Sequence, residues 1–344
     1  MANDFLKELK KINPYAEIIE DDTLSNINEF ISTGSLLLNS IISGDFNKGI
    51  PAGRITTLGG LSGVGKSLIA ASTAANAQKL GYDVIYFDSE FAGDKDFMER
   101  LGVDISKLIK IPIATLEEFK NQCFKIIDVY NEKYKDTKKI MIVMDSLGNL
   151  ASEKELNDAT EGKNASDMGQ RSKVIRSTLR ILADKVGKAR IPVIIVNHTY
   201  ANPINIYAGE IMSGGEGLVY CSHVIINFKK SKIKDDDKTV TGTLLKPTTT
   251  KNRIFPPFKT GEIFLDFEKG MDKYYGLLPL AEASGLVVKE GRKYKSSKTD
   301  KLFWEKDIYC EEFFGPLLND LNIYLKDKGY SCISEEVLNE PRKD

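Results

Sequence analysis

The segment Gly60-Leu61-Ser62-Gly63-Val64-Gly65-Lys66-Ser67 combines the residue types and the spacing that bind a chain of phosphates. Its glycines let backbone N–H groups converge on phosphate oxygens, and the helix expected after it adds a positive N-terminal end. Lys66 would reach the β- and γ-phosphates of a nucleotide, and the Ser67 hydroxyl would bind Mg²⁺. The segment is therefore typical of a P-loop, with a strand before it and a helix after it. The predicted phosphate-binding residues are Gly60, Ser62, Gly63, Val64, Gly65, Lys66, Ser67 and Leu68.

Two carboxylates follow apolar strands and could complete a hydrolytic site. Asp145 ends the apolar run 140–145, where a P-loop ATPase places the carboxylate that binds Mg²⁺. Glu90 follows the run that ends at Asp88, and a carboxylate there could orient and deprotonate an attacking water. A turn or helix-capping aspartate is the alternative for Asp145, and the P-loop disfavours it. For Glu90, a solvated loop glutamate remains open at this point.

The elements that would hold these residues alternate between apolar strands and helices. Strands covered on both faces in a parallel sheet are continuously apolar, and several runs here have that character. We expect strands at 54–58, 83–88, 140–145 and 193–197, with helices at 67–80, 115–134 and 170–187 between them. This alternation predicts a doubly wound α/β core. In such a sheet the polar strand ends gather at the carboxyl edge, where ligands bind.

The remaining segments predict additions to this core. After residue 224 we expect strands at 224–228, 243–245 and 263–267 that extend the sheet antiparallel, and residues 274–344 predict a small, mostly helical appendage. The stretches 152–168 and 199–217 lack periodicity, and loops of that length are commonly functional. We therefore divide the chain into an N-terminal helix and linker (1–26), an ATPase core (27–273) and a C-terminal appendage (274–344).

A helix over residues 4–12 would place Phe5, Leu9 and Ile12 on one face. A helix this short cannot bury its apolar stripe alone. It either packs back on its own domain or docks on a neighbouring subunit, and the sequence leaves both open.

The composition limits the classes of function. The chain has 344 residues, 28% of them charged, with 48 Lys+Arg against 49 Asp+Glu and a formal net charge of -1. Nucleic-acid binders are often basic overall, so any DNA contact here would come from a local patch or from many subunits acting together. The four cysteines form neither a zinc spacing nor a disulfide framework, which fits a reducing compartment. No apolar run approaches the ~20 residues that span a bilayer, so we expect no membrane association.

Several short motifs occur in the order and spacing of the RecA recombinase family, with the strongest resemblance to the phage UvsX recombinases. They are Ser32-Thr33-Gly34-Ser35, the P-loop, Asp88-Ser89-Glu90, Asp145-Ser146 and Asn197-His198. The run 145–152, Asp-Ser-Leu-Gly-Asn-Leu-Ala-Ser, is the most specific of these similarities. The resemblance covers about residues 27–330. It implies a RecA-like P-loop core whose mostly parallel, doubly wound sheet has an antiparallel extension.

The resemblance also implies roles for individual residues. Glu90 matches the catalytic glutamate, and His198 matches the residue that senses the γ-phosphate, which is glutamine in the bacterial proteins. Without this match, a lone histidine such as His198 is more often a core residue whose hydrogen bonds are satisfied. Asp94 matches the residue that binds the adenine amino group, and Phe97 matches an aromatic residue that stacks on the base.

Lys251 and Arg253 match a basic pair that reaches across to the ATP of a neighbouring subunit. The alternative is a pair of solvated charges beside a Pro-Pro turn. Residues 152–168 and 199–217 match the first and second DNA-binding loops. The candidate DNA-binding residues are Ile204, Ile206, Ile211, Met212 and Arg171, and local packing is the alternative for the apolar ones.

A basic run at 289–301 could contact incoming duplex DNA, although a solvated loop is the simpler interpretation. We leave its role open.

Taken with the motifs, the resemblance implies an ATP- and Mg²⁺-dependent recombinase that forms a helical filament on single-stranded DNA. Such a filament pairs its strand with a homologous double-stranded DNA and exchanges strands. The phage relatives suggest a single-strand DNA-binding protein and a loading mediator as further partners. The expected location is the cytoplasm, or the host cytoplasm for a phage protein, in association with DNA.

Two alternatives come from other classes. A hexameric ring helicase shares the core but normally carries a sizeable N-terminal domain, and the stretch before the P-loop is short. A small-molecule P-loop kinase needs an acceptor pocket and a basic lid, and residues 199–217 contain no lysine or arginine.

Overall fold

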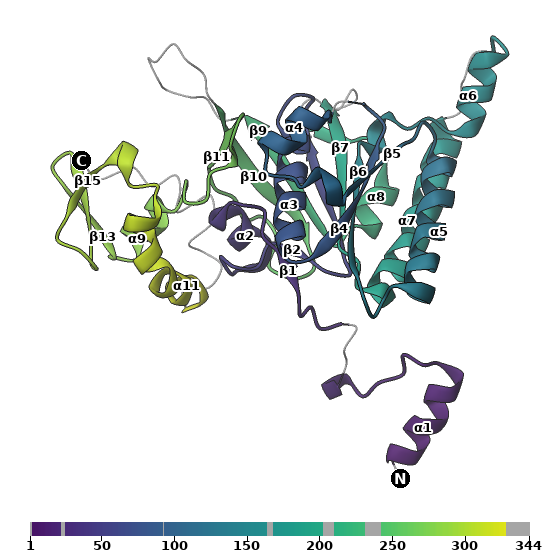
Figure 1. The fold of residues 1–344 in the computed structure, drawn as a ribbon, viewed down its shortest axis with the longest axis horizontal. Helices are drawn as coiled ribbons and strands as arrows, with labels where there is room; N and C mark the ends of the chain where they lie inside the picture. Colours follow the sequence, from purple (N-terminus) through teal and green to yellow (C-terminus); the bar gives the residue numbers. More distant parts are fainter. Residues whose placement is uncertain are drawn as a thin grey trace.

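The computed structural model describes residues 2–21, 25–91, 93–163, 168–201, 210–230 and 242–327. Within them, a ten-stranded sheet follows the order β12-β11-β10-β9-β3-β7-β6-β4-β5, and β8 pairs with β7 off this path (Figure 1). The parallel strands are β3 (Ile55–Gly60), β4 (Tyr82–Asp88), β5 (Leu108–Pro112), β6 (Lys139–Asp145), β7 (Val193–Ala201) and β9 (Val224–Lys230). The predicted α/β core with a mostly parallel sheet is confirmed.

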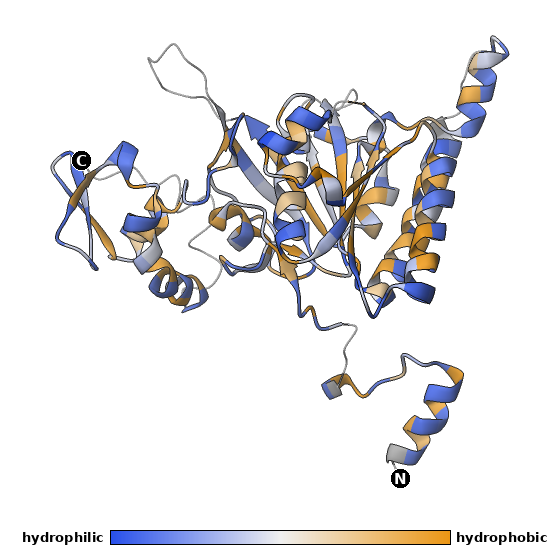
Figure 2. Ribbon diagram, in the orientation of Figure 1, coloured by the Kyte–Doolittle hydropathy of each residue, from blue (hydrophilic) through white to orange (hydrophobic). Residues whose placement is uncertain are grey.

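Helices cover both faces of this sheet, as continuously apolar strands require. One hydrophobic core joins it to α2 (Leu36–Ser43) and α3 (Lys66–Lys79), and a second joins it to α5 (Leu116–Lys133) and α7 (Met168–Ala189). The helices turn apolar residues inward and polar residues outward (Figure 2). The sheet is thus buried on both sides, and its carboxyl edge remains for ligands.

The register of the strands sets which residues meet at that edge. Asp88 of β4 lies opposite Asp145 of β6, and Gly60 of β3 lies opposite His198 of β7. Residues far apart in the sequence therefore converge where β3, β4, β6 and β7 end.

The strands after residue 224 differ in part from the prediction. We expected all of them to run antiparallel, but β9 pairs in parallel with β3. The chain crosses over through α8 (Glu216–Cys221) before β9 begins, and a crossover connection returns a strand in the same direction. The extension becomes antiparallel with β10 (Gly242–Asn252), β11 (Ile263–Asp266) and β12 (Gly270–Met271).

The two stretches expected to be irregular also contain regular structure. Helix α6 (Glu153–Thr160) lies in the first, and its start is a capping box between Ser152 and Glu155. In the second, β7 continues to Ala201 and pairs with β8 (Glu210–Met212), because backbone hydrogen bonds stabilise a strand pair without an apolar pattern. Ile204 and Ile206 lie outside the described residues.

The C-terminal part is less helical than expected. It contains an antiparallel sheet of β13 (Val287–Glu290), β14 (Lys293–Ser296) and β15 (Leu302–Trp304) beside α9 (Leu278–Ala283), α10 (Glu311–Phe314) and α11 (Leu318–Asp327). Val287, Tyr294 and Phe303 are buried, and their strand neighbours Val288, Leu302 and Trp304 are exposed, which is the alternation of a half-buried sheet. The basic run 289–301 contains the end of β13 and all of β14, and ion pairs to acidic residues partly neutralise it.

Helix α1 (Ala2–Ile12) stands apart from the sheet in Figure 1. Its Phe5 is 68% exposed and its Ile12 is 83% exposed. Among the residues that the structure describes, the apolar stripe thus stays largely exposed. The small elements are β1 (Phe30–Ile31), β2 (Ile50–Pro51), α4 (Lys95–Arg100) and short 3₁₀ turns at Ile19–Asp21, Ile105–Lys107, Leu147–Asn149, Glu305–Asp307 and Gly315–Leu317.

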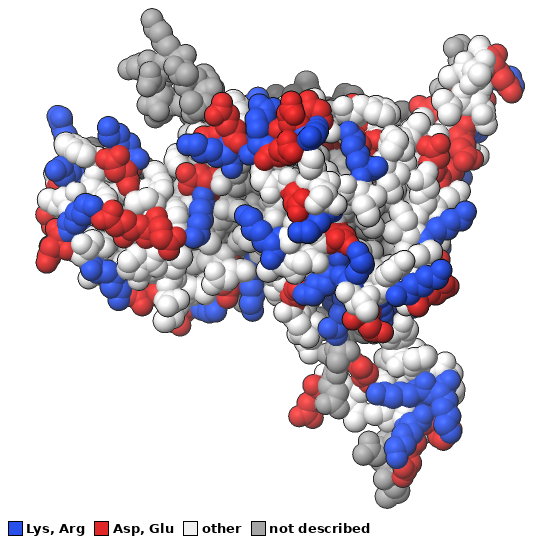
Figure 3. Space-filling model, viewed as in Figure 1, with Lys and Arg blue, Asp and Glu red and all other residues white. Residues whose placement is uncertain are grey.

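The surface carries charges of both signs. On the face in Figure 3, acidic and basic side chains are interspersed over the core, in keeping with the near-zero net charge. Among the helices of the described ranges, not one has both the length and the apolar character needed to cross a membrane.

Candidate nucleotide-binding site

A cavity of about 290 Å³ opens at the carboxyl edge of the sheet, over the P-loop. The P-loop connects β3 to α3, and Gly63 and Gly65 have φ values of 70° and 97°, which favour glycine. A Cβ atom on Gly65 would lie 2.4 Å from the Leu265 side chain, so this position also needs the smallest residue. The lining includes Ser62, Gly63, Gly65, Lys66, Ser67, Leu68, Glu90, Phe97, Asp145 and His198 among the predicted residues. Gly60, Val64 and Asp94 are not part of it.

The Lys66 ammonium lies inside the loop. Only 4% of Lys66 is exposed, and its Nζ donates hydrogen bonds to the carbonyl oxygens of Gly60 and Leu61, both at 2.9 Å. Burial lowers its pKa, against the opposing charges of Asp145 and Glu90. These neighbours favour the charged form, so the site places a cation beside two carboxylates.

Asp145 and Ser67 form the other wall of the loop. Asp145 is 5% exposed, and its Oδ2 accepts a hydrogen bond from the Tyr86 hydroxyl at 2.5 Å. Within the described part of the chain, its Oδ1 is buried and accepts no hydrogen bond, and the Ser67 hydroxyl lies nearby. Burial raises the pKa of Asp145, although the Tyr86 hydrogen bond and the nearby Ser67 hydroxyl act in the opposite direction. An unpaired buried carboxylate oxygen beside a hydroxyl fits the oxygen ligands that Mg²⁺ prefers.

No cluster of three or more His, Cys, Asp or Glu that could hold a metal occurs in the described part of the chain. A Mg²⁺ ion bound to a nucleotide does not need one, because one or two protein oxygens and the phosphates hold it.

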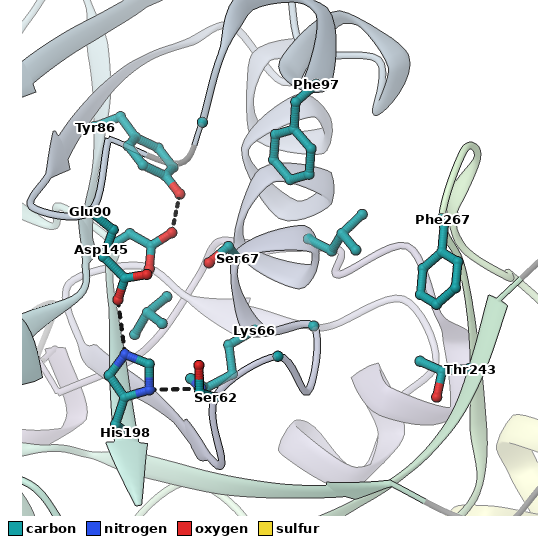
Figure 4. A pocket seen from close by; sticks show the side chains of 15 residues that line it. Ser62, Lys66, Ser67, Tyr86, Glu90, Phe97, Asp145, His198, Thr243 and Phe267 are labelled. Atoms are coloured by element: carbon teal, nitrogen blue, oxygen red, sulfur yellow. Dashed lines mark hydrogen bonds and ion pairs between the residues drawn. The ribbon is translucent and has the colours of Figure 1, made fainter.

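Glu90 and His198 connect to Lys66 in a chain of hydrogen bonds (Figure 4). His198 Nε2 lies 2.8 Å from Glu90 Oε1, and His198 Nδ1 lies 3.4 Å from Lys66 Nζ. A neutral imidazole with its proton on Nε2 satisfies both contacts, because it donates to Glu90 and accepts from Lys66. Burial raises the pKa of Glu90, but hydrogen bonds from Ser146 and His198 and nearby positive charge bring it below its usual value. The arrangement keeps Glu90 ionised.

Two phenylalanines line the cavity, and Figure 4 shows both on the side away from Glu90 and His198. Phe97, from α4, was predicted. Phe267 follows β11 and was missed, because no spacing in the sequence connects it to the P-loop. Asp94 is the N-cap of α4, and its Oδ1 accepts a hydrogen bond from the Phe97 backbone N–H at 2.7 Å. The carboxylate of Asp94 thereby positions the helix that carries Phe97.

Lys251 and Arg253 do not line the cavity of this chain. The Lys251 ammonium donates hydrogen bonds to the carbonyl oxygens of Val219 at 2.5 Å and Tyr220 at 3.0 Å. Arg253 donates to the same Tyr220 oxygen at 3.3 Å. Both cations therefore rest at the C-terminal end of α8, where helix carbonyls favour positive charge.

The described candidates for DNA contact are half-buried or engaged with the backbone. Ile211 and Met212 are half-buried in β8, and Met212 packs against the second core. The Arg171 guanidinium donates to the carbonyl oxygens of Gly148 at 2.8 Å and Leu150 at 3.0 Å. It holds the turn where the first loop leaves the sheet.

Comparisons with known proteins show which proteins the chain resembles. The family described as "RecA N-terminal domain" matches residues 6–272. The "Recombination and repair protein" of Enterobacteria phage T4 is 30% identical over 305 residues, covering 85% of this chain and 76% of that protein. "Protein RecA" of Malacoplasma penetrans is 29% identical over 321 residues, covering 92% and 89%. "Protein RecA" of Thermotoga maritima is 29% identical over 279 residues, covering 80% and 74%.

Proposed function

The chain belongs to the RecA family of recombination proteins, whose role is homologous pairing and strand exchange, and on that premise we propose that it is a DNA-dependent ATPase. It assembles as a helical filament on single-stranded DNA, with ATP at each P-loop. It pairs the bound strand with a homologous double-stranded DNA, and hydrolysis weakens its hold on the product.

The observation that carries this proposal is the hydrogen-bonded chain from Lys66 through His198 to Glu90. In the proposed reaction a water oxygen attacks the γ-phosphorus, and the bond from that phosphorus to the ADP oxygen breaks. Glu90 is held in its ionised form, and it takes the proton of the water as the new P–O bond forms. Lys66 offsets negative charge on the β- and γ-phosphates. His198 contacts both side chains, so a change at the γ-phosphate alters the position of Glu90.

Ser67 and Asp145 would hold the Mg²⁺ ion, which neutralises phosphate charge when bound. The buried Oδ1 of Asp145, without a partner among the described residues, supports this assignment. Tyr86 holds the other oxygen and so fixes the direction in which the carboxylate points.

Phe97 and Phe267 would hold the base between them, with Asp94 beside Phe97 for the adenine amino group. Since stacking on one aromatic ring contributes about 1–3 kcal/mol per base, we expect Phe267→Ala to raise KM for ATP about tenfold with little change in kcat. Steady-state hydrolysis measures both constants. Phe264→Ala is the matched control, because Phe264 lies on β11 and packs against Tyr275, 5.9 Å between ring centroids, away from the cavity. An unchanged KM in Phe267→Ala would remove Phe267 from the site.

Assembly would complete the site. We propose the domain limits 1–26, 27–273 and 274–344. In the filament, the exposed apolar stripe of α1 docks on the next subunit. Lys251 and Arg253 would reach the neighbouring ATP. DNA would lie along the loops at 152–168 and 199–217, with Ile204, Ile206, Ile211, Met212 and Arg171 as contacts. A single-strand DNA-binding protein and a loading mediator would assist.

The experiment that tests the enzymatic part is ATP hydrolysis with and without single-stranded DNA. We expect low turnover by the chain alone and a rise of about tenfold or more when DNA assembles complete sites. Equal turnover in both conditions would contradict the proposed DNA dependence.

A further inference from the structure

Asn149 contacts Glu90 from the turn that leads into the first loop. It is the last residue of the 3₁₀ turn Leu147–Asn149, directly after β6, and its Nδ2 donates a hydrogen bond to Glu90 Oε1 at 2.9 Å. The first loop begins at residue 152, only three residues further along. A side-chain hydrogen bond thus connects the proposed general base, Glu90, to the start of a proposed DNA-binding loop.

The same Glu90 oxygen accepts two more hydrogen bonds. Ser146 Oγ donates at 2.6 Å and His198 Nε2 at 2.8 Å, so three donors converge on Oε1. Within the described residues, Oε2 accepts no hydrogen bond. A carboxylate held through one oxygen presents the other in a fixed direction, which is what proton transfer from a positioned water requires. Ser146 and His198 lie on the sheet edge, whereas Asn149 reaches Glu90 from the turn.

The turn is held from the far side of the first loop. Arg171 belongs to the first turn of α7, where the chain returns from that loop. Its guanidinium donates to the carbonyl oxygens on either side of Asn149, those of Gly148 and Leu150. The two ends of the loop therefore meet at the residue that touches Glu90, and a shift of either end changes where the Asn149 amide lies.

We propose that Asn149 is a positioning residue that holds Glu90 in its reactive orientation and makes that orientation depend on the first loop. This rests on the proposed function, in which Glu90 is the general base and the loop contacts DNA. DNA bound at the loop sets the position of the turn, and the turn sets the direction of the Glu90 carboxylate through one hydrogen bond. Hydrolysis then responds to DNA without any contact between DNA and the nucleotide.

The test uses three substitutions in the full chain. Asn149→Asp keeps the shape but removes the donor, Asn149→Ala removes the side chain, and Asn149→Gln keeps the donor on a longer arm. We expect kcat on single-stranded DNA to fall about tenfold or more in the first two, because each loses a hydrogen bond to a charged group. KM for ATP should stay within about twofold, since Asn149 does not line the cavity. Asn149→Gln should recover part of kcat. Asn131→Ala, an exposed asparagine of α5, is the matched control.

A double-mutant cycle with Glu90→Gln shows whether Asn149 acts through Glu90. If it does, Asn149→Ala should change single-turnover hydrolysis by less than about twofold in the Glu90→Gln background. The full single-mutant effect in that background, or wild-type kcat in Asn149→Asp, would overturn the inference. If the wild-type chain hydrolyses ATP at the same rate with and without DNA, the proposed function is contradicted instead. The failure of the inference and the failure of the proposed function are therefore distinguishable.

Discussion

Replacing Lys251 and Arg253 together by alanine is expected to lower ATP hydrolysis on single-stranded DNA by about 10³-fold, with nucleotide binding retained. Neither side chain lines the cavity of its own chain, and both rest on the carbonyl oxygens at the end of α8. In the proposed filament, a cation supplied by a neighbouring subunit would stabilise charge on the transferring phosphoryl group, and a subunit without neighbours would lack it. Binding of a fluorescent ATP analogue and steady-state turnover measure the two effects separately.

Mixing the Lys251→Ala/Arg253→Ala variant with Lys66→Ala tests whether the basic pair acts between subunits. Lys66→Ala lacks a working P-loop but keeps the basic pair, so a mixed filament contains sites with a wild-type P-loop facing wild-type Lys251 and Arg253. We expect partial recovery of turnover when the two inactive proteins are combined. Lys133→Ala/Lys135→Ala, which removes two exposed lysines at the end of α5, should behave as wild type. Co-assembly without any recovery, or normal turnover by the double variant alone, would show that the site is not shared.

Glu90→Gln is expected to slow hydrolysis by about 10²-fold or more while ATP binding and filament assembly continue. Glutamine can keep the hydrogen bonds to Ser146 and Asn149, but it cannot take a proton from water. The pKa of Glu90 lies below its usual value, and the base works when ionised. Wild-type kcat should therefore hold as the pH falls to about 5, and decline only as the pH approaches that lowered pKa.

Single-turnover hydrolysis and electron microscopy of DNA-bound filaments test the two parts of this prediction. Glu132→Gln, the same change at an exposed position of α5, controls for the substitution itself. A fall in turnover of less than about tenfold would exclude Glu90 as the general base.

The phosphate-binding part of the site could be predicted because its chemistry is local in the sequence. A P-loop needs particular residues at fixed spacing, and the apolar strand before Asp145 carries that residue to the edge of the sheet. The pairing of β4 with β6 then places Asp88 opposite Asp145, with Glu90 two residues beyond. The predicted helix at 67–80 and strands at 83–88 and 140–145 are confirmed within one or two residues as α3, β4 and β6.

The residues that the sequence did not reveal are brought to the site by the order of strands and by turns. Phe267 faces the cavity because β11 joins the antiparallel extension beside β10. The order of strands in a sheet cannot be predicted from a local sequence pattern. Asn149 sits in a turn that accepts a hydrogen bond from Arg171, which lies at the other end of the first loop. Helix α6 has a capping box at Ser152, but its polar composition gives no apolar stripe, so periodicity did not indicate it.

Strand exchange by the wild-type chain is the measurement that tests the central claim most directly. A circular single strand and a homologous linear duplex are incubated with the protein, ATP and Mg²⁺, and the joint molecules and products are separated by electrophoresis. We expect products with the homologous duplex, none with a heterologous duplex of equal length, and none with Lys66→Ala, whose P-loop cannot hold the phosphates. Unwinding of the duplex regardless of homology, or no product while the protein is bound to DNA with ATP, would contradict the assignment as a strand-exchange protein.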